Sequence, residues 1–179
     1  LYAGLTIKSD KVRQNIRLKY ESRSRDGSAP DDEFKVRYGV DLFFKERWFL
    51  FNHVEIGANE KKRIDERYEI SSGFGFQIWD EKRRALSIES GASYVHELFD
   101  KPDKPSSDFE SSRVSPSWRL ALKFRQKLPF STELGYSQAL LYSFGEARQL
   151  DFGADLSLTV PIAAGIFSKL KWEYDYDSV

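Results

Sequence analysis

Apolar and polar residues alternate one by one through most of this sequence, in runs that recur about ten times. In the last run, Leu170, Trp172 and Tyr174 fall on one side of the alternation, whereas Lys171 and Glu173 fall on the other. A period of two places successive side chains on opposite faces of a β-strand, whereas a helix would need a period of 3.6. The pattern therefore predicts an all-β chain whose strands each have one apolar and one polar face.

The predicted strands are long, and the connections between them alternate in length. Phe34–Phe44 and Val114–Phe124 exceed the about five or six residues usual in soluble proteins and match the roughly 9–11 residues of a tilted membrane-spanning strand. Short turns near Ser9 and Lys45 alternate with longer polar connections such as SRSRDGSAPDDE, as in outer-membrane barrels. We predict one domain over residues 1–179, a transmembrane antiparallel up-and-down β-barrel with about ten strands in this chain.

The order of the connections also predicts where the strands run. If the short turns are periplasmic, the first strand runs toward the periplasm and the last strand, which contains Trp172, ends outside. Bacterial barrels usually begin and end in the periplasm and have an even number of strands. We therefore expect about twelve strands in the complete protein, with the first and the last of them outside this chain.

The polar face of the predicted strands combines charged residues with small ones such as Gly73, Gly75 and Gly91. Glycine weakens strand pairing at a solvated surface, but small residues fit a crowded closed interior. A lipid-facing Arg119 near the middle of the bilayer would cost about 2–4 kcal/mol. We therefore predict that the polar face lines the lumen and that the apolar face meets lipid. A soluble β-barrel of the opposite orientation is the alternative.

Two sets of residues follow from this orientation. The charged residues predicted to line the lumen are Arg13, Arg17, Lys19, Arg37, Asp41, Glu69, Glu89, Arg119, Lys123, Arg125, Glu133, Asp151, Asp155, Lys169, Lys171 and Glu173. The residues predicted to face lipid are Ile16, Leu18, Val40, Leu42, Ile70, Phe74, Ile88, Leu120, Leu122, Leu134, Phe152, Leu156, Leu158, Leu170 and Trp172. Because both signs are well represented in the lumen set, we expect little selectivity for either sign of ion.

The composition argues against several classes of protein. Lys and Arg together number 28, as do Asp and Glu, so the basic excess typical of a nucleic-acid-binding protein is missing. The absence of cysteine removes disulfides and thiolate chemistry. No apolar run reaches the roughly 20 residues of a transmembrane helix. We expect outer-membrane lipids and an envelope protein as partners, and no nucleic acid.

Few residues indicate chemistry at a specific site. His96 lies close in sequence to Ser93 and Glu97, a combination that a lipid hydrolase of the envelope would use. A histidine at the barrel rim is the simpler interpretation. His53 shares its face with Glu55 and is expected to join a polar network inside the barrel.

Three carboxylates near the end of the chain could bind a hard cation, because Glu173, Asp175 and Asp177 fall on one strand face. Lys169 and Lys171 share that face, so ion pairs across the lumen are the preferred interpretation. We predict no catalytic residue, no metal site and no cofactor.

The segment RWFLFNHVEIGANEKKRIDERYEISSGFGFQIWDEKRRALSIESGASY, with the later LSLTVPI and LKWEYDYDS, resembles the family of salt-induced outer-membrane proteins. The motifs that carry the resemblance are Arg47–Phe51, Tyr68 with Gly73 and Gly75, and Leu86–Gly91. This is a bacterial domain family of unknown function, and the resemblance covers nearly the whole chain. It implies a barrel in the bacterial outer membrane and brings no catalytic residues with it.

The sequence therefore predicts a bacterial outer-membrane β-barrel with a polar, charge-paired lumen. Such a protein would act as a structural or anchoring barrel or as a narrow conduit for small solutes, depending on whether the lumen is open. An outer-membrane lipid-modifying enzyme is the first alternative, and a soluble β-barrel binding protein is the second.

Overall fold

The computed structural model describes residues 1–23, 31–60, 63–100, 111–144, 149–163 and 166–178. Within these residues the chain forms β1 (Tyr2–Lys8), β2 (Val12–Arg23), β3 (Asp31–Phe43), β4 (Trp48–Asn59), β5 (Ile64–Asp80), β6 (Arg84–Phe99), β7 (Ser112–Lys127), the short 3-10 helix η2 (Pro129–Ser131), β8 (Glu133–Ser143), β9 (Leu150–Ala163) and β10 (Ile166–Asp177). Among the described residues, no helix has the length and apolar character needed to cross a membrane.

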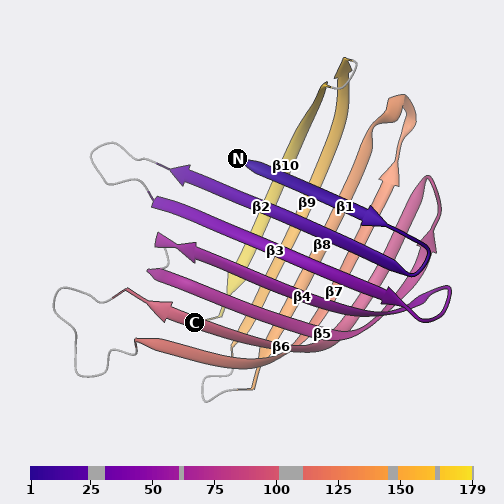
Figure 1. Cartoon of the computed structure of the whole chain (residues 1–179). Coiled ribbons are helices and arrows are strands. Elements are labelled where there is room, and N and C mark those ends of the chain that lie inside the picture. The colour runs from indigo at the N-terminus through magenta and orange to yellow at the C-terminus, as the bar shows by residue number, and fades with distance from the viewer. Residues whose placement is uncertain (24–30, 61–62, 101–110, 145–148, 164–165, 179) are drawn as a thin grey trace.

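Each strand pairs with the next one along the chain, and all the pairs are antiparallel, in the order β1 to β10. The prediction of an all-β fold with about ten antiparallel strands is confirmed. The sheet curls into a half-barrel with β1 and β10 at its two edges (Figure 1). Lys19 on β2 reaches Glu173 on β10, with Nζ 3.2 Å from Oε2, so the curl brings opposite ends of the sheet together.

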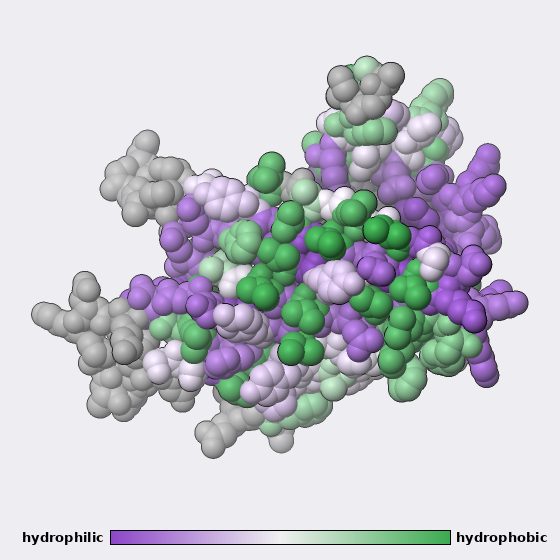
Figure 2. All heavy atoms as spheres, viewed as in Figure 1, coloured by the Kyte–Doolittle hydropathy of each residue, from purple (hydrophilic) through white to green (hydrophobic). Residues whose placement is uncertain are grey.

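Burial alternates along the strands with the period that the sequence predicts. On β4, His53 and Glu55 are buried, whereas the neighbouring Val54 and Ile56 are exposed. The concave inner face of the sheet carries the buried side chains, and the convex outer face carries exposed apolar ones. Figure 2 shows hydrophobic residues gathered on the outer face of the strands nearest the viewer.

The inner face is closely packed across β4, β5 and β6. Phe49 lies against Gly75, where an added Cβ would be 2.1 Å from Phe49 Cζ. Gly73 and Gly91 are partners across β5 and β6, and a Cβ on Gly73 would lie 2.4 Å from the Gly91 Cα. These positions need glycine because the opposing atoms approach more closely than any side chain permits.

The inner face is open across β8 and β9, where several of the inward positions are small. They include Gly135, Ser137, Ala139, Gly153 and Ser157. Gly135 pairs with Ser157, and Ser137 pairs with Asp155, so small side chains lie side by side on the two strands. This part of the wall leaves space into which long side chains from other strands extend.

Candidate functional site

Two cavities lie along the inner face of the curled sheet. The smaller cavity has a volume of about 170 Å³ and is lined in part by Lys35, Glu55 and Glu173. The larger cavity has a volume of about 730 Å³ and extends toward the short turns, where Lys8 at the end of β1 and Ala85 at the start of β6 line it.

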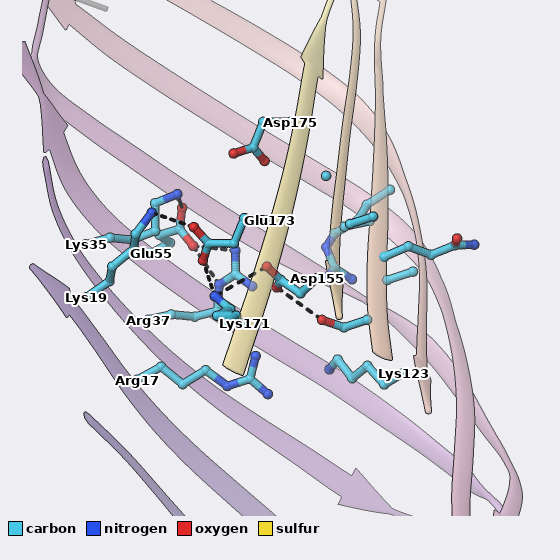
Figure 3. A pocket seen from close by; sticks show the side chains of 17 residues that line it. Arg17, Lys19, Lys35, Arg37, Glu55, Lys123, Asp155, Lys171, Glu173 and Asp175 are labelled. Carbon is cyan, nitrogen blue, oxygen red and sulfur yellow. Dashed lines mark hydrogen bonds and ion pairs between the residues drawn. The ribbon is translucent and has the colours of Figure 1, made fainter. Parts of the chain in front are cut away.

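Five residues line both cavities, and together they are called the neck: Arg17, Lys123, Ser137, Asp155 and Lys171. Lys171 Nζ lies 3.3 Å from Asp155 Oδ1, and Ser137 Oγ donates a hydrogen bond to Asp155 Oδ2 at 3.2 Å. Arg17 and Lys123 extend into the same space from opposite walls (Figure 3). The two cavities therefore adjoin at a polar ring with three cations and one carboxylate.

Cations outnumber carboxylates on the surface of the two cavities by eleven to seven. The cations are Lys8, Arg13, Arg17, Lys19, Lys35, Arg37, Arg119, Lys123, Arg125, Lys169 and Lys171. The carboxylates are Asp41, Glu55, Asp80, Glu133, Asp155, Glu173 and Asp175. The cavity surface therefore has more positive than negative groups, although the whole chain has equal numbers of both.

This excess arises because some carboxylates lie in the wall beside the cations that line the cavities. Glu89 is 1% exposed, and it accepts hydrogen bonds from Arg119 Nη1 at 3.0 Å and from Lys123 Nζ. Arg119 and Lys123 both line the smaller cavity, whereas Glu89 lines neither cavity. Long Lys and Arg stems carry their charge farther from the backbone than a carboxylate can.

Asp41 forms a second buried centre with Arg13 and His53. Arg13 Nε donates a hydrogen bond to Asp41 Oδ2 at 2.8 Å, and His53 Nε2 lies 3.7 Å from Asp41 Oδ1. Neither His53 Nε2 nor Asp41 Oδ1 has a hydrogen-bond partner among the described residues.

The only group of potential metal ligands within the described residues is Asp41, His53 and Glu89, whose ligand atoms lie within 4.8 Å of one another. Arg13 already binds Asp41, and Arg119 and Lys123 already bind Glu89. A divalent cation would have to displace or approach these positive groups. The geometry therefore favours an ion-pair network at this position.

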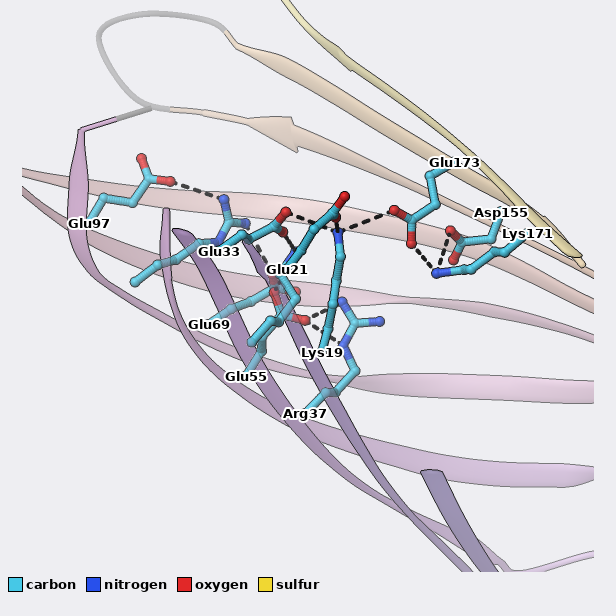
Figure 4. A network of polar contacts seen from close by, with 12 residues as sticks. Lys19, Glu21, Glu33, Arg37, Glu55, Glu69, Glu97, Asp155, Lys171 and Glu173 are labelled. Atoms are coloured by element: carbon cyan, nitrogen blue, oxygen red, sulfur yellow. Dashed lines mark hydrogen bonds and ion pairs between the residues drawn. The ribbon is translucent and has the colours of Figure 1, made fainter. Parts of the chain in front are cut away.

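Ion pairs also join neighbouring strands on the inner face (Figure 4). Arg37 Nε donates to Glu55 Oε2 at 2.6 Å, and Arg67 Nη1 donates to Glu97 Oε1 at 3.0 Å. Lys19 on β2 binds Glu173 on β10 and so joins strands from both sides of the curl. These pairs hold long side chains in place on the inner face.

All of the charged residues predicted for the lumen lie on the inner face of the sheet. Most of them line a cavity. Glu69 and Glu89 are instead buried in the wall, and Asp151 is half-buried and lines neither cavity. The residues predicted to face lipid have outer-face parity and are exposed or half-buried, and one of them, Ile16, also contributes to the lining of the larger cavity. Ile70 and Phe74 are 58% and 60% exposed. Contact of this face with lipid stays a prediction, as do the interfacial girdles of Trp48, Trp79, Trp118 and Trp172.

The three residues considered for a lipid hydrolase, which are Ser93, His96 and Glu97, do not share one face of the sheet. Ser93 is buried on the inner face, where its Oγ lies 2.9 Å from Ser71 Oγ, and Glu97 is buried on the same face and bound to Arg67. His96 has the opposite parity on β6 and lies on the outer face. His53, in contrast, lies in the inner polar network as predicted.

Of the three carboxylates considered as ligands for a hard cation, Glu173, Asp175 and Asp177, the first forms ion pairs with lysines. Glu173 binds Lys19 and Lys171, and the side chain of Asp177 lies outside the described part of the chain. Glu173 therefore belongs to the ion-pair network of the lumen.

Two aromatic residues of the inner face were not anticipated from the sequence. Phe49 and Phe51 are completely buried, and they pack under cations: Arg13 Cζ lies 5.2 Å from the Phe49 ring centroid, and Arg119 Cζ lies 5.5 Å from that of Phe51. Their shared parity with His53 on β4 is the signal that could have identified them.

The family described as "Protein of unknown function, DUF481" matches residues 2–179. The match agrees with the resemblance to a family of unknown function over nearly the whole chain, while the salt-induced and outer-membrane designation stays a prediction. No curated protein and no solved structure gives a significant match.

Proposed function

Because the chain belongs to the DUF481 family, whose function is unknown, we propose its role from its own geometry: an outer-membrane β-barrel whose charged interior is a narrow conduit for small solutes. The observation that carries the proposal is the distribution of side chains over the two faces of the curled sheet. Charged residues gather on the concave face and apolar residues on the convex face.

This distribution suits a bilayer better than water. Asp41, Glu89 and Arg119 are at most 3% exposed, whereas Ile70 and Phe74 are more than half exposed. A soluble barrel would bury its apolar face, and large exposed apolar patches are uncommon on soluble monomers. In lipid the same apolar face is favourable, and the charged groups are kept away from hydrocarbon.

The strand lengths agree with a membrane-spanning sheet. A strand tilted by about 45° needs about 9–11 residues to cross the hydrocarbon core. β5 has 17 residues, and β6 and β7 have 16 each, so they can cross and extend beyond it. The short turns would then lie in the periplasm and the longer connections outside.

The two adjoining cavities support a conduit along this interior. The larger cavity extends toward the short turns, the smaller one toward the middle of the sheet, and the neck joins them. Their surfaces carry many charged groups, which favour water and ions over apolar solutes. Small hydrated solutes are the class that such a space would accept.

A closed anchoring barrel is the second candidate. It is favoured by the ion pair between Lys19 and Glu173, which joins β2 and β10 across the interior. In this role the barrel would hold an envelope protein through its loops or rim, and its lumen would pass no current.

Single-channel recording of the full-length protein in a planar lipid bilayer tests the conduit directly. We expect discrete, reproducible conductance steps from protein whose β-structure has been verified by circular dichroism. A folded, inserted barrel that carries no current would reject the conduit and leave the anchoring role.

A further inference from the structure

The neck has an excess of positive charge. Arg17, Lys123 and Lys171 contribute three cations, and Asp155 contributes the single carboxylate. Selectivity in narrow pores is set by rings of charged side chains, with Lys and Arg rings selecting anions. A solute path lined by residues of this composition attracts anions and repels cations.

Arg17 is the neck cation most available to a solute. Its guanidinium has no ion-pair or hydrogen-bond partner among the described side chains, and it lines both cavities. Lys123 and Lys171, in contrast, bind Glu89 and Asp155 respectively. A guanidinium presents several N–H donors in a plane, which matches the oxygens of phosphate and carboxylate groups and also attracts halides.

The cation excess continues into the larger cavity. Arg125 also lines this cavity and has no partner among the described side chains, whereas Glu89 lies in the wall. A solute that enters from the short-turn end therefore meets unpaired arginines before and at the neck.

We propose that the neck makes the barrel selective for small anions, with Arg17 as the main selectivity-determining residue. This inference rests on the proposed conduit and names the class of solute that it passes. It also replaces the expectation of little selectivity, because that expectation treated the carboxylates of the wall as if they faced the solute.

The test is the reversal potential of the full-length protein in a planar bilayer under a potassium chloride gradient, with both solutions at about 0.1 M or below so that screening is limited. We expect chloride to be more permeant than potassium. Arg17→Gln should lower the chloride-to-potassium permeability ratio by about thirtyfold, because one unit charge a few ångströms from an ion in water attracts chloride about fivefold and repels potassium about fivefold. Arg17→Glu should favour potassium.

Arg83→Gln is the matched control, because Arg83 lies in the β5–β6 turn, is exposed and lines neither cavity. Its permeability ratio should equal that of the unmodified protein. Conductance that shows no preference for chloride, or a ratio that Arg17→Gln leaves unchanged, would overturn the anion selectivity while keeping the conduit. The absence of any conductance in folded protein would overturn both.

Discussion

Arg119 Nη1 lies 3.0 Å from Glu89 Oε2, and both side chains are almost completely buried on the inner face of the sheet. Lys123 Nζ binds the other oxygen of Glu89, so one carboxylate holds two cations from β7. The pair shows how the charged interior is built: short acidic side chains form the wall, and longer basic side chains extend from it toward the lumen.

Removing the acidic partner should destabilise the barrel. Glu89→Gln leaves Arg119 and Lys123 without their shared carboxylate, and breaking a buried ion pair in this way costs about 3–5 kcal/mol. Urea unfolding in lipid vesicles, followed by tryptophan fluorescence, measures the change. Glu133→Gln, at a half-buried carboxylate that lines the larger cavity, should have a much smaller effect. If both variants lowered the free energy of unfolding equally, the buried ion pair would not be an important source of stability.

Gly75 should be intolerant of even a methyl group. An added Cβ would overlap the ring of Phe49 at 2.1 Å, so Gly75→Ala should lower the free energy of unfolding by about 1–3 kcal/mol through overpacking. Gly4→Ala serves as a control, because a Cβ there would meet its nearest neighbour at an ordinary 3.7 Å.

The same clash predicts a rescue. In the Gly75→Ala background, replacing Phe49 by Leu removes the overlapping ring atoms, so the two substitutions should cost less together than the sum of their separate effects. Additive losses would show that Phe49 does not limit the space at Gly75.

A large side chain at the neck should block the proposed conduit. Ser137→Trp places an indole where the two cavities adjoin, so single-channel conductance should fall strongly while folding is kept. Ala92→Trp adds the same side chain to the exposed outer face of β6 and should leave the conductance unchanged. A current that Ser137→Trp does not reduce would place the solute path elsewhere.

The β5–β6 turn should show a small acid sensitivity. Arg84 donates hydrogen bonds to both oxygens of Glu81, at 3.0 Å and 2.9 Å, and this lowers the pKa of the Glu81 carboxyl below its usual value. A lowered folded-state pKa means that this stabilisation is present above the ordinary pKa of a glutamate and is lost as the pH falls through the lowered value. NMR titration of Glu81 should report the lowered pKa, and Arg84→Gln should return it toward normal.

The strands and the two faces of the sheet could be predicted from the sequence because a period of two has only one structural interpretation over long runs. Arg17, Lys171 and Ile70 lie on the faces that their parity predicts. Parity does not report residue depth, however. Phe49 and Phe51 could not be placed from hydropathy, because an aromatic residue suits lipid and also packs under interior cations.

The neck could not be predicted because it depends on the curl of the sheet. Arg17 and Lys171 are far apart in the sequence and line the same space only because β2 and β10 are brought together. The distinction between Glu89 in the wall and Arg17 in the cavity likewise depends on side-chain length and curvature. Charge counting along strands gives a near balance on the inner face, whereas the surface of the two cavities has more cations than carboxylates.

We propose above all that the outer face of this sheet meets lipid and the inner face meets water. Because the chain has no cysteine, single cysteines at positions 152–160 of β9 can each carry a spin label in protein reconstituted in bilayers. Accessibility to oxygen, which concentrates in lipid, should peak at the positions of Leu156 and Leu158. Accessibility to a water-soluble nickel complex should peak at those of Ser157 and Thr159. Oxygen accessibility that peaks at positions 157 and 159 instead, or high accessibility to the nickel complex at every position, would contradict the membrane barrel.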